Sequence, residues 1–345
     1  MIIILAGHED FTLMRIMMNH KRFFLLLLTV AMPLSIFAEF EVFVVERSSG
    51  MVQTGPDTLV PFGTYTEFEY GSNYTSWLEM IPVDETVTGA QVATPGGVQA
   101  LELDPWDGSY LARGEYATKG EIEAGIPAGT YTFSGSGSLS GAVSEVITIG
   151  ELSLLTPLKI TNFSDLQSVD VSQPLVIKWE EFTEGQGEGV NGGFAGVVNV
   201  EVWGFDDAGV FDVYDSEEDT PDGAFGLLPT TTQVTIPAGR LKADAFHIVN
   251  IFFARIDVGD EAASSGLKAA LTGYEIETNI YLQGQTPYWG NFPVDPQGWA
   301  DTGSWLGKLN TRLQPWVWSD DLQKRLYILR SGLHENGGWV YFPKN

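Results

Sequence analysis

Short stretches of the chain alternate between hydrophobic and polar residues, and turn-forming residues separate them. Strict alternation is typical of half-buried β-strands, whose successive side chains point to opposite faces of a sheet. Gly, Pro, Asn and Asp recur between these stretches, as expected for a β-sandwich. Helical periodicity is missing, apart from a single predicted turn at 119–124. The strands predicted before residue 153 are 39–46, 64–70, 98–103, 131–133 and 146–149.

The next part of the chain predicts seven strands, the number in an immunoglobulin-like (Ig-like) sandwich. They are 158–161, 175–179, 197–203, 210–214, 233–236, 247–256 and 274–282. The tetrapeptide Ile-Pro-Ala-Gly occurs at 126–129 and again at 236–239. Pro fixes φ and Gly permits positive φ, so the repeat predicts a similar loop in two sandwiches.

The composition changes near residue 285. Six of the ten Trp residues follow this point, and the segment 286–345 carries six basic and five acidic residues. Short strands are predicted at 316–318, 325–329 and 339–342. The sequence therefore predicts an all-β protein of two Ig-like β-sandwich domains followed by a small aromatic-rich β-meander tail. The predicted domains are a β-sandwich at 39–152, an Ig-like β-sandwich at 153–284 and a Trp-rich β tail module at 285–345.

The N-terminal segment has the pattern of a secretory signal peptide. Lys21 and Arg22 precede an apolar run at 23–37, and the small residue Ala38 follows. This run is shorter than the roughly 20 residues of a spanning helix, although an uncleaved anchor is the alternative. Residues 1–38 are therefore interpreted as a signal peptide with an overlong start, and the mature product is expected to have no integral membrane span.

The charge balance restricts the partners. The chain has 18 Lys and Arg residues against 45 Asp and Glu residues, a formal net charge of −27. Nucleic acid and anionic membrane are disfavoured, because Lys and Arg must neutralise their phosphates. The chain has no cysteine, which excludes disulfides, thiolate nucleophiles and zinc–thiolate sites. The interpretation is an exported bacterial protein, extracellular or at the cell surface.

Candidate catalytic residues are few. After the signal segment only His247 and His334 remain, and no Gly-x-Ser-x-Gly elbow precedes a helix, so a Ser–His–Asp triad is disfavoured. Paired carboxylates can hydrolyse glycosides, and a cluster of four follows the strand predicted at 175–179. Its members are Glu180, Glu181, Glu184 and Glu188. Because acidic residues are abundant and this loop is rich in Gly, a solvated loop is favoured over a catalytic pair.

An acidic loop gives the candidate metal site. Several carboxylates lie within a few residues of one another, and calcium takes several such oxygens at once. The candidate calcium ligands are Asp215, Glu217, Asp219 and Asp222. The alternative is a solvated acidic loop without metal; no other cofactor is predicted.

Aromatic residues of the tail give the candidate binding site. Exposed Trp and Tyr rings stack on sugar faces and anchor interfaces. The candidates are Trp305, Trp316, Trp318, Tyr327, Trp339 and Tyr341. The alternative is that a module of about 60 residues needs these rings for its core. Trp316 and Trp318 should share one face of a strand, where both rings could be exposed together. The predicted partner of such a surface is a glycan or a surface protein.

The tail also resembles a known group of proteins. The segments that carry the resemblance are 298–307, 315–319, 326–327 and 338–341. They resemble the C-terminal tail of uncharacterised bacterial exported proteins, and 155–282 resembles the Ig-like domain that precedes such tails. The resemblance implies surface or extracellular placement and carries no catalytic residues or ligand.

Taken together, these patterns predict a non-enzymatic extracellular or cell-surface binding or structural module. The alternative is an exported carbohydrate-active enzyme that uses paired carboxylates. Ig-like sandwiches host many functions, so the fold alone does not choose between them.

Overall fold

The structure is a computed structural model, and it describes most of the chain after residue 39. The described ranges are 40–62, 72–82, 87–105, 108–138, 141–151, 153–187, 195–206, 209–216, 226–243, 245–261, 267–283, 288–289, 292–295, 298–313, 316–328, 333–334, 337–338 and residue 340. The predicted signal segment 1–38 lies outside them. No helix in these ranges is long and apolar enough to cross a membrane.

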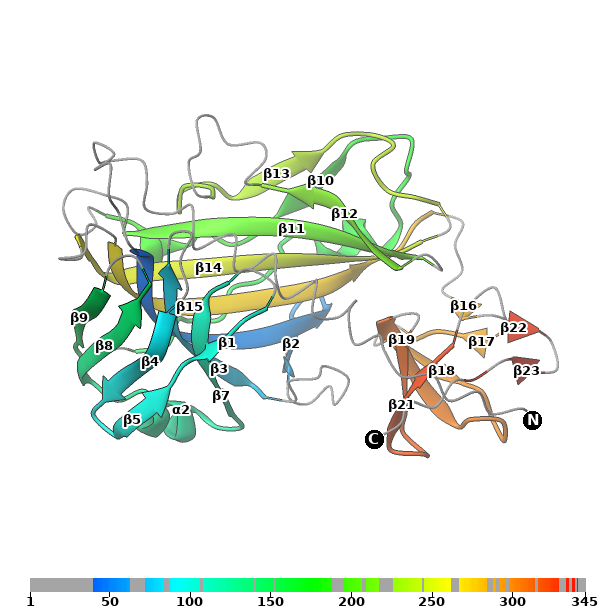
Figure 1. Cartoon of the computed structure of the whole chain (residues 1–345). Helices are drawn as coiled ribbons and strands as arrows, with labels where there is room; N and C mark the ends of the chain where they lie inside the picture. The colour runs from blue at the N-terminus through cyan, green and yellow to red at the C-terminus, as the bar shows by residue number, and fades with distance from the viewer. Residues whose placement is uncertain are drawn as a thin grey trace.

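The described chain folds mainly into strands, as predicted for an all-β protein (Figure 1). A nine-stranded sheet runs in the order β12-β11-β14-β15-β1-β3-β7-β6, with β2 paired to β1. We call it the large sheet. Its strands are β1 (Phe40–Gly55), β2 (Thr58–Pro61), β3 (Tyr74–Pro82), β6 (Glu102–Leu103), β7 (Tyr110–Tyr116), β11 (Gly196–Asp206), β12 (Gly209–Asp215), β14 (Phe246–Glu261) and β15 (Leu267–Ile280).

The large sheet joins the two segments that were predicted as separate sandwiches. Strand β1 pairs in parallel with β15, from Val42 beside Leu267 to Val52 beside Glu277. On its other edge β1 pairs antiparallel with β3. A parallel partner needs a long crossover connection, and here the connection is most of the chain. The segments 39–152 and 153–284 therefore share one hydrogen-bonded sheet.

A second, four-stranded sheet packs on the β1, β3 and β7 part of the large sheet. It runs in the order β5-β4-β8-β9 and we call it the small sheet. Its strands are β4 (Val87–Thr94), β5 (Gly97–Ala100), β8 (Gly129–Gly137) and β9 (Gly141–Ile149). Phe43 and Leu78 of the large sheet and Phe133 of the small sheet are buried in the core between them. The rings of Phe43 and Phe133 lie 5.8 Å apart.

Helix α2 (Lys119–Gly125) leads into β8, where one helical turn was predicted. It begins with a capping box: the Thr118 side chain accepts a hydrogen bond from the Glu121 amide, and the Glu121 carboxylate accepts one from the Thr118 amide. These contacts satisfy amides that the first turn of a helix leaves free. Ile122 anchors the helix by its buried side chain.

The other half of the large sheet is covered by a two-stranded layer, β10 (Leu175–Lys178) and β13 (Gln233–Ile236). The core between them contains the buried aromatic residues Trp179 and Phe253. Short 3-10 turns, η2 (Phe163–Gln167) and η3 (Thr183–Gly185), connect the elements. The predicted strand at 158–161 is reduced to a single bridge between Ile160 and Trp179.

A polar row separates these two cores on the same face of the large sheet. The pairing aligns Arg255, Thr272, Arg47 and Ser76 on β14, β15, β1 and β3. Asp257 accepts hydrogen bonds from Arg255 Nε at 2.6 Å and Thr272 Oγ1 at 2.5 Å. Burial lowers the pKa of Arg47, while the negative charge of Asp257 raises it. The charges of this row compensate one another where the two cores meet.

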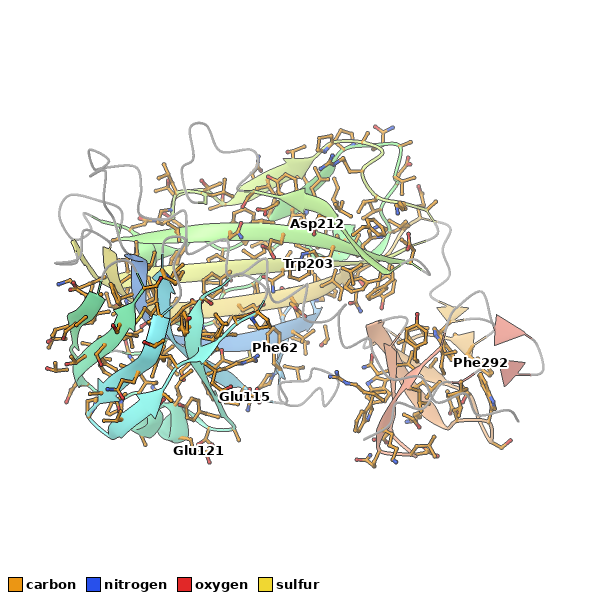
Figure 2. All side chains as sticks on the ribbon, in the orientation of Figure 1. Phe62, Glu115, Glu121, Trp203, Asp212 and Phe292 are labelled. Atoms are coloured by element: carbon orange, nitrogen blue, oxygen red, sulfur yellow. The ribbon has the colours of Figure 1, made fainter. Side chains whose placement is uncertain are left out.

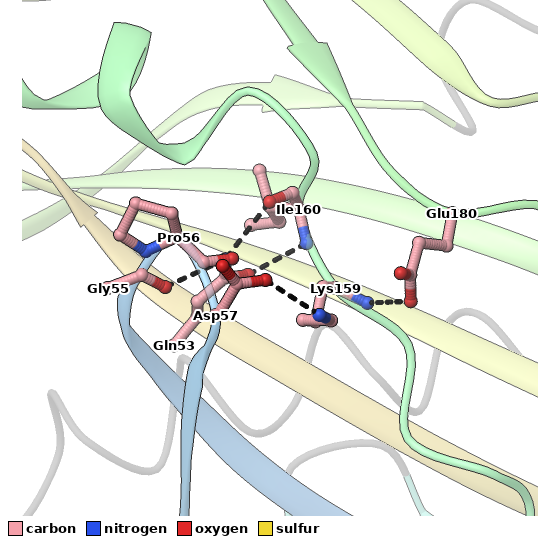
Figure 3. Close-up of polar contacts among 7 residues, drawn as sticks. All are labelled: Gln53, Gly55, Pro56, Asp57, Lys159, Ile160 and Glu180. Atoms are coloured by element: carbon pink, nitrogen blue, oxygen red, sulfur yellow. Dashed lines mark hydrogen bonds and ion pairs between the residues drawn. The ribbon is translucent and has the colours of Figure 1, made fainter.

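Gln53 ties the β1–β2 hairpin to the segment that follows the small sheet (Figure 3). Its Nε2 donates to the Ile160 carbonyl at 3.0 Å, and its Oε1 accepts from the Ile160 amide at 2.7 Å. Nearby, Lys159 Nζ lies 3.0 Å from Asp57, and the Lys159 amide donates to Glu180. The Gln53 amide thus replaces the backbone partner that Ile160 would have in a strand.

The C-terminal segment forms its own small sheets, drawn in orange and red in Figure 1. A four-stranded sheet runs in the order β18-β19-β20-β21 and we call it the tail sheet. Its strands are β18 (Trp299–Asp301), β19 (Lys308–Leu313), β20 (Trp316–Ser319) and β21 (Lys324–Tyr327). Two hairpins accompany it, β16 (Tyr288–Trp289) with β17 (Phe292–Pro293), and β22 (Leu333–His334) with β23 (Gly337–Gly338). The antiparallel order of the tail sheet is that of a meander.

Candidate functional site

The tail sheet has one face in its own hydrophobic core. Ala300, Leu309, Val317 and Leu326, one from each strand, are all buried there. Because side chains alternate along strands, the residues next to these four point to the opposite face. We call that opposite face the outer face of the tail sheet. It is where an aromatic binding surface would have to lie.

The four strands align four residues across the outer face, one from each strand. Trp299 pairs with Asn310, Asn310 with Trp318, and Trp318 with Arg325. Trp299, Trp318 and Arg325 are half-buried, and Asn310, between the two Trp residues in the row, is buried. Tyr327, two residues after Arg325, shares this face and is also half-buried. The row combines aromatic rings with an amide and a guanidinium group.

The six predicted aromatic candidates therefore fall into three groups. Trp318 and Tyr327 lie together on the outer face, and Trp316 pairs with Tyr327 at the start of β20. Trp305 packs against the tail core instead: its ring is stacked with Trp289 at 6.1 Å and with Phe292 at 6.1 Å, in the region labelled at Phe292 in Figure 2. Trp339 and Tyr341 lie outside the described residues.

A ligand could contact the ring of Trp318 but not its indole N–H group. Its indole nitrogen is enclosed and has no hydrogen-bond partner within the described part of the chain. The ring remains partly exposed, since the residue as a whole is half-buried. A ligand at Trp318 would therefore contact the ring, and its polar groups would meet neighbouring side chains.

Trp299, Asn310 and Arg325 were not among the predicted binding residues. The alternation of side chains along the strands could have indicated them, because each directly adjoins a core residue of the tail sheet. Asn310, for example, follows Leu309, which is fully buried. Only the strand pairing shows that the three form one row.

The calcium candidates are only partly described. Asp215 ends β12 and is half-buried, and Ser216 follows it. Glu217, Asp219 and Asp222 lie outside the described residues. Within the described ranges no three His, Cys, Asp or Glu residues are grouped so that they could hold a metal ion. The calcium site stays a prediction.

The carboxylates after β10 bind neighbouring groups of the protein. Glu180 accepts a hydrogen bond from the Lys159 amide at 3.0 Å, and Glu184 accepts one from the Thr156 amide at 2.8 Å. Glu184 also lies 3.3 Å from the guanidinium group of Arg255. Glu181 accepts from Gln186 at 2.7 Å, and Glu188 lies outside the described residues. These contacts give the three described carboxylates structural partners.

A second group of carboxylates, unforeseen from the sequence, lies on the face of the large sheet away from the two-stranded layer. The pairing aligns Glu201, Asn250 and Glu277 on β11, β14 and β15. Asn250 donates to Glu277 at 3.4 Å and also to Glu275. Glu201 and Glu277 are only 2% and 5% exposed. We call these residues the carboxylate–amide row.

The remaining candidate, His247, is fully buried at the start of β14. Its Nε2 accepts a hydrogen bond from the Lys242 amide at 3.3 Å, and its ring lies 6.2 Å from that of Phe211. These contacts are those of a core histidine. His334 lies on β22 in the tail, so the structure places the two histidines in different sheets.

No protein-family model and no curated protein matches the chain. A solved structure described as "Ca2+-stabilized adhesin helps an Antarctic bacterium reach out and bind ice" is similar over 72% of this chain and 51% of its own, at 9% identity and a TM-score of 0.19. This chain thus spans about half the length of that protein. A likeness this small indicates neither fold nor ligand for the present chain.

Proposed function

We propose that this protein is a non-enzymatic module that attaches to saccharides outside the cell through the outer face of its tail sheet. The observation that carries the proposal is the juxtaposition of the half-buried residues Trp318, Tyr327 and Arg325 on that face. Aromatic rings contact the apolar faces of sugars. A guanidinium group donates hydrogen bonds to hydroxyl oxygens.

The separate packing of the sheets supports a binding role for the tail sheet. The large sheet and the small sheet bury their own cores, and the tail sheet has a core of its own. A binding face on a separately packed sheet can change its side chains without disturbing the larger cores. The signal-like segment 1–38 supports export, and the resemblance of the tail to exported proteins supports a place at the cell surface.

An enzyme with paired carboxylates is the less favoured alternative. A glycosidic oxygen must come within hydrogen-bond distance of a catalytic acid. Glu201 and Glu277 of the carboxylate–amide row are 2% and 5% exposed, which leaves a substrate almost no surface to contact. Glu180 and Glu184 bind backbone amides, which orients them toward the protein itself.

The proposal is tested with a glycan array and a cell-envelope pull-down, each with calcium and with chelator. The full chain is compared with a double variant, Trp318→Ala with Tyr327→Ala. Leu322→Ala is the matched control, because Leu322 is an exposed apolar residue of the same module in the β20–β21 turn. We expect binding by the wild type and the control, and loss in the double variant.

Two outcomes would refute the proposal. Equal binding by the double variant would show that the outer face of the tail sheet does not bind the glycan. Release of reducing sugar from a glycan on the array by the wild-type chain would show catalysis instead. Binding that needs calcium would support the predicted site around Asp215 as a second requirement.

A further inference from the structure

The charge balance of the tail module differs from that of the whole chain. Of the 18 Lys and Arg residues six lie at 286–345, whereas only five of the 45 Asp and Glu residues do. The chain as a whole repels anions, because its formal net charge is −27. The outer face of the tail sheet therefore lies in a segment of nearly balanced charge, where an anionic ligand meets little local repulsion.

Arg325 brings a positive charge to the rings of the outer face. It lies opposite Trp318 of β20 in the strand pairing, and Tyr327 follows it by two residues on the same face. Residues directly opposite in an antiparallel pair have Cβ atoms about 4.5–5.5 Å apart. Residues two apart along a strand lie about 7 Å apart. A ligand that spans the two rings is thus within reach of the guanidinium group.

The other charged residues of the outer face lie together at one end of it. Lys308 is opposite Asp301 in the pairing of β18 with β19, and its carbonyl accepts a hydrogen bond from the Asp320 amide at 2.9 Å. All three are exposed, and opposite charges on neighbouring strands attract one another. The adjacent row contains a single charged residue, Arg325, in the series Trp299, Asn310, Trp318 and Arg325.

A guanidinium group beside two aromatic rings favours a sugar that carries a carboxylate. The guanidinium fork matches a carboxylate with two parallel N–H···O bonds, and such charge-assisted bonds are about twice as strong as neutral ones. The group has five N–H donors, so a contact within the protein leaves donors for a ligand. In a uronic acid the carboxylate is attached at the edge of the sugar ring, and the face of the ring stays available for stacking.

We infer that the outer face of the tail sheet binds acidic polysaccharides that contain uronic acids, with sugar rings on Trp318 and Tyr327 and a carboxylate on Arg325. This inference rests on the proposed function, since it names the class of saccharide that the same face takes. Acidic residues farther than about 8 Å from the ligand contribute little repulsion at physiological ionic strength, because salt screens them. Arg325 is therefore the residue that distinguishes acidic from neutral saccharides.

The test compares two ligands that share a backbone and differ in the charge of the carboxyl group. Oligogalacturonate and its methyl ester are each titrated calorimetrically into the full chain at about 0.15 M salt. The variants are Arg325→Gln, which removes the charge, and Arg325→Lys, which keeps the charge without the paired donors. Lys324→Gln is the matched control. It removes the same charge at the adjacent, exposed position of β21, whose side chain points away from the outer face.

We expect the wild type and Lys324→Gln to bind the acid at least about tenfold more tightly than the ester. Arg325→Gln should bind the two forms equally, and Arg325→Lys should keep part of the preference. If the melting temperature shows that Arg325→Gln does not fold, the comparison of Arg325→Lys with Lys324→Gln decides. The inference is overturned if the wild type does not prefer the acid, if Arg325→Gln keeps the full preference, or if Lys324→Gln loses it.

Failure of this inference is distinguishable from failure of the proposed function. A chain that binds neutral glycans of the array through Trp318 and Tyr327, but does not prefer oligogalacturonate, overturns the inference alone. A chain whose binding to every glycan is unchanged by Trp318→Ala with Tyr327→Ala overturns both.

Discussion

Replacing Gln53 by Ala should destabilise the protein strongly, although the side chain is neutral and is not part of the proposed binding face. Gln53 is buried and exchanges two hydrogen bonds with the backbone of Ile160, which is fully buried. The change to Ala leaves the Ile160 amide and carbonyl without these partners. An unsatisfied buried backbone group costs about 1–3 kcal/mol. We therefore expect Gln53→Ala to lower the free energy of unfolding by about 4 kcal/mol.

The loss is measured by urea denaturation, followed by tryptophan fluorescence, and by calorimetry. For a unit of this size each kcal/mol corresponds to about 2–4 °C in melting temperature, so the shift should be roughly 10 °C. The control is Gln173→Ala, because Gln173 is exposed and should change stability by less than about 0.5 kcal/mol. A loss below about 1 kcal/mol in Gln53→Ala would refute the reasoning that Gln53 joins β1 to the second segment.

Three further predictions concern the large and small sheets. Asp257→Asn should lower the free energy of urea unfolding by about 1.5–3 kcal/mol, because it weakens the charge-assisted hydrogen bonds that Arg255 and Thr272 donate to Asp257, while Glu184 still compensates the charge of Arg255; an unchanged midpoint would contradict this. Burial raises the pKa of Tyr131 to about 12 from 10.0, so stability should be full below pH 10 and fall as pH rises toward 12. Tyr131→Phe should flatten that decline, and a parallel decline in the variant would count against it. Gly50→Ala should lower the melting temperature, because a Cβ there would lie 2.1 Å from the Phe62 ring; a variant as stable as the wild type would show that the ring moves aside without cost.

The strands that the alternation predicted were mostly found in the described residues, and two of the missed ones, β3 and β7, share a cause. The strands predicted at 233–236 and 210–214 match β13 and β12 closely, and 64–70 lies outside the described residues. Strands β3 and β7 were not predicted, since polar and apolar residues do not alternate cleanly along them. Both of their faces lie against other parts of the protein or at its half-buried edge, so neither face is consistently polar.

The sequence did not predict that β1 and β15 join the segments 39–152 and 153–284 in one sheet. Each strand is apolar enough to pair, but the pairing depends on which edge of a sheet the other segment leaves free. The carboxylate–amide row was missed for a related reason. Glu residues in strands usually face solvent, whereas nearly all of β11, including Glu201, is buried.

In the tail, the sequence indicated that aromatic residues matter. It did not indicate which of them lie in the core and which lie on the surface. Trp305 and Trp318 have the same side chain, and both lie in a segment dense in Trp. Trp305 stacks with Trp289 in the core, whereas Trp318 lies on the outer face beside Arg325 in the pairing. The repeat of Ile-Pro-Ala-Gly predicted a similar loop twice, but its two copies differ: Gly129 has a φ of 144° at the start of β8, whereas Gly239 has a φ of 79° in the turn after β13. Alternation thus predicted many strands, and the pairing of distant strands was not predictable.

The central claim is that the outer face of the tail sheet binds saccharide, and one titration tests it directly. The oligosaccharide bound most tightly on the array is titrated calorimetrically into the wild type, Trp318→Ala and Leu322→Ala. An aromatic contact contributes about 0.5–1.5 kcal/mol beyond its buried area, and about 1.4 kcal/mol is a tenfold change in Kd. The account predicts at least tenfold weaker binding by Trp318→Ala and wild-type binding by Leu322→Ala. Equal Kd values for all three proteins would contradict it.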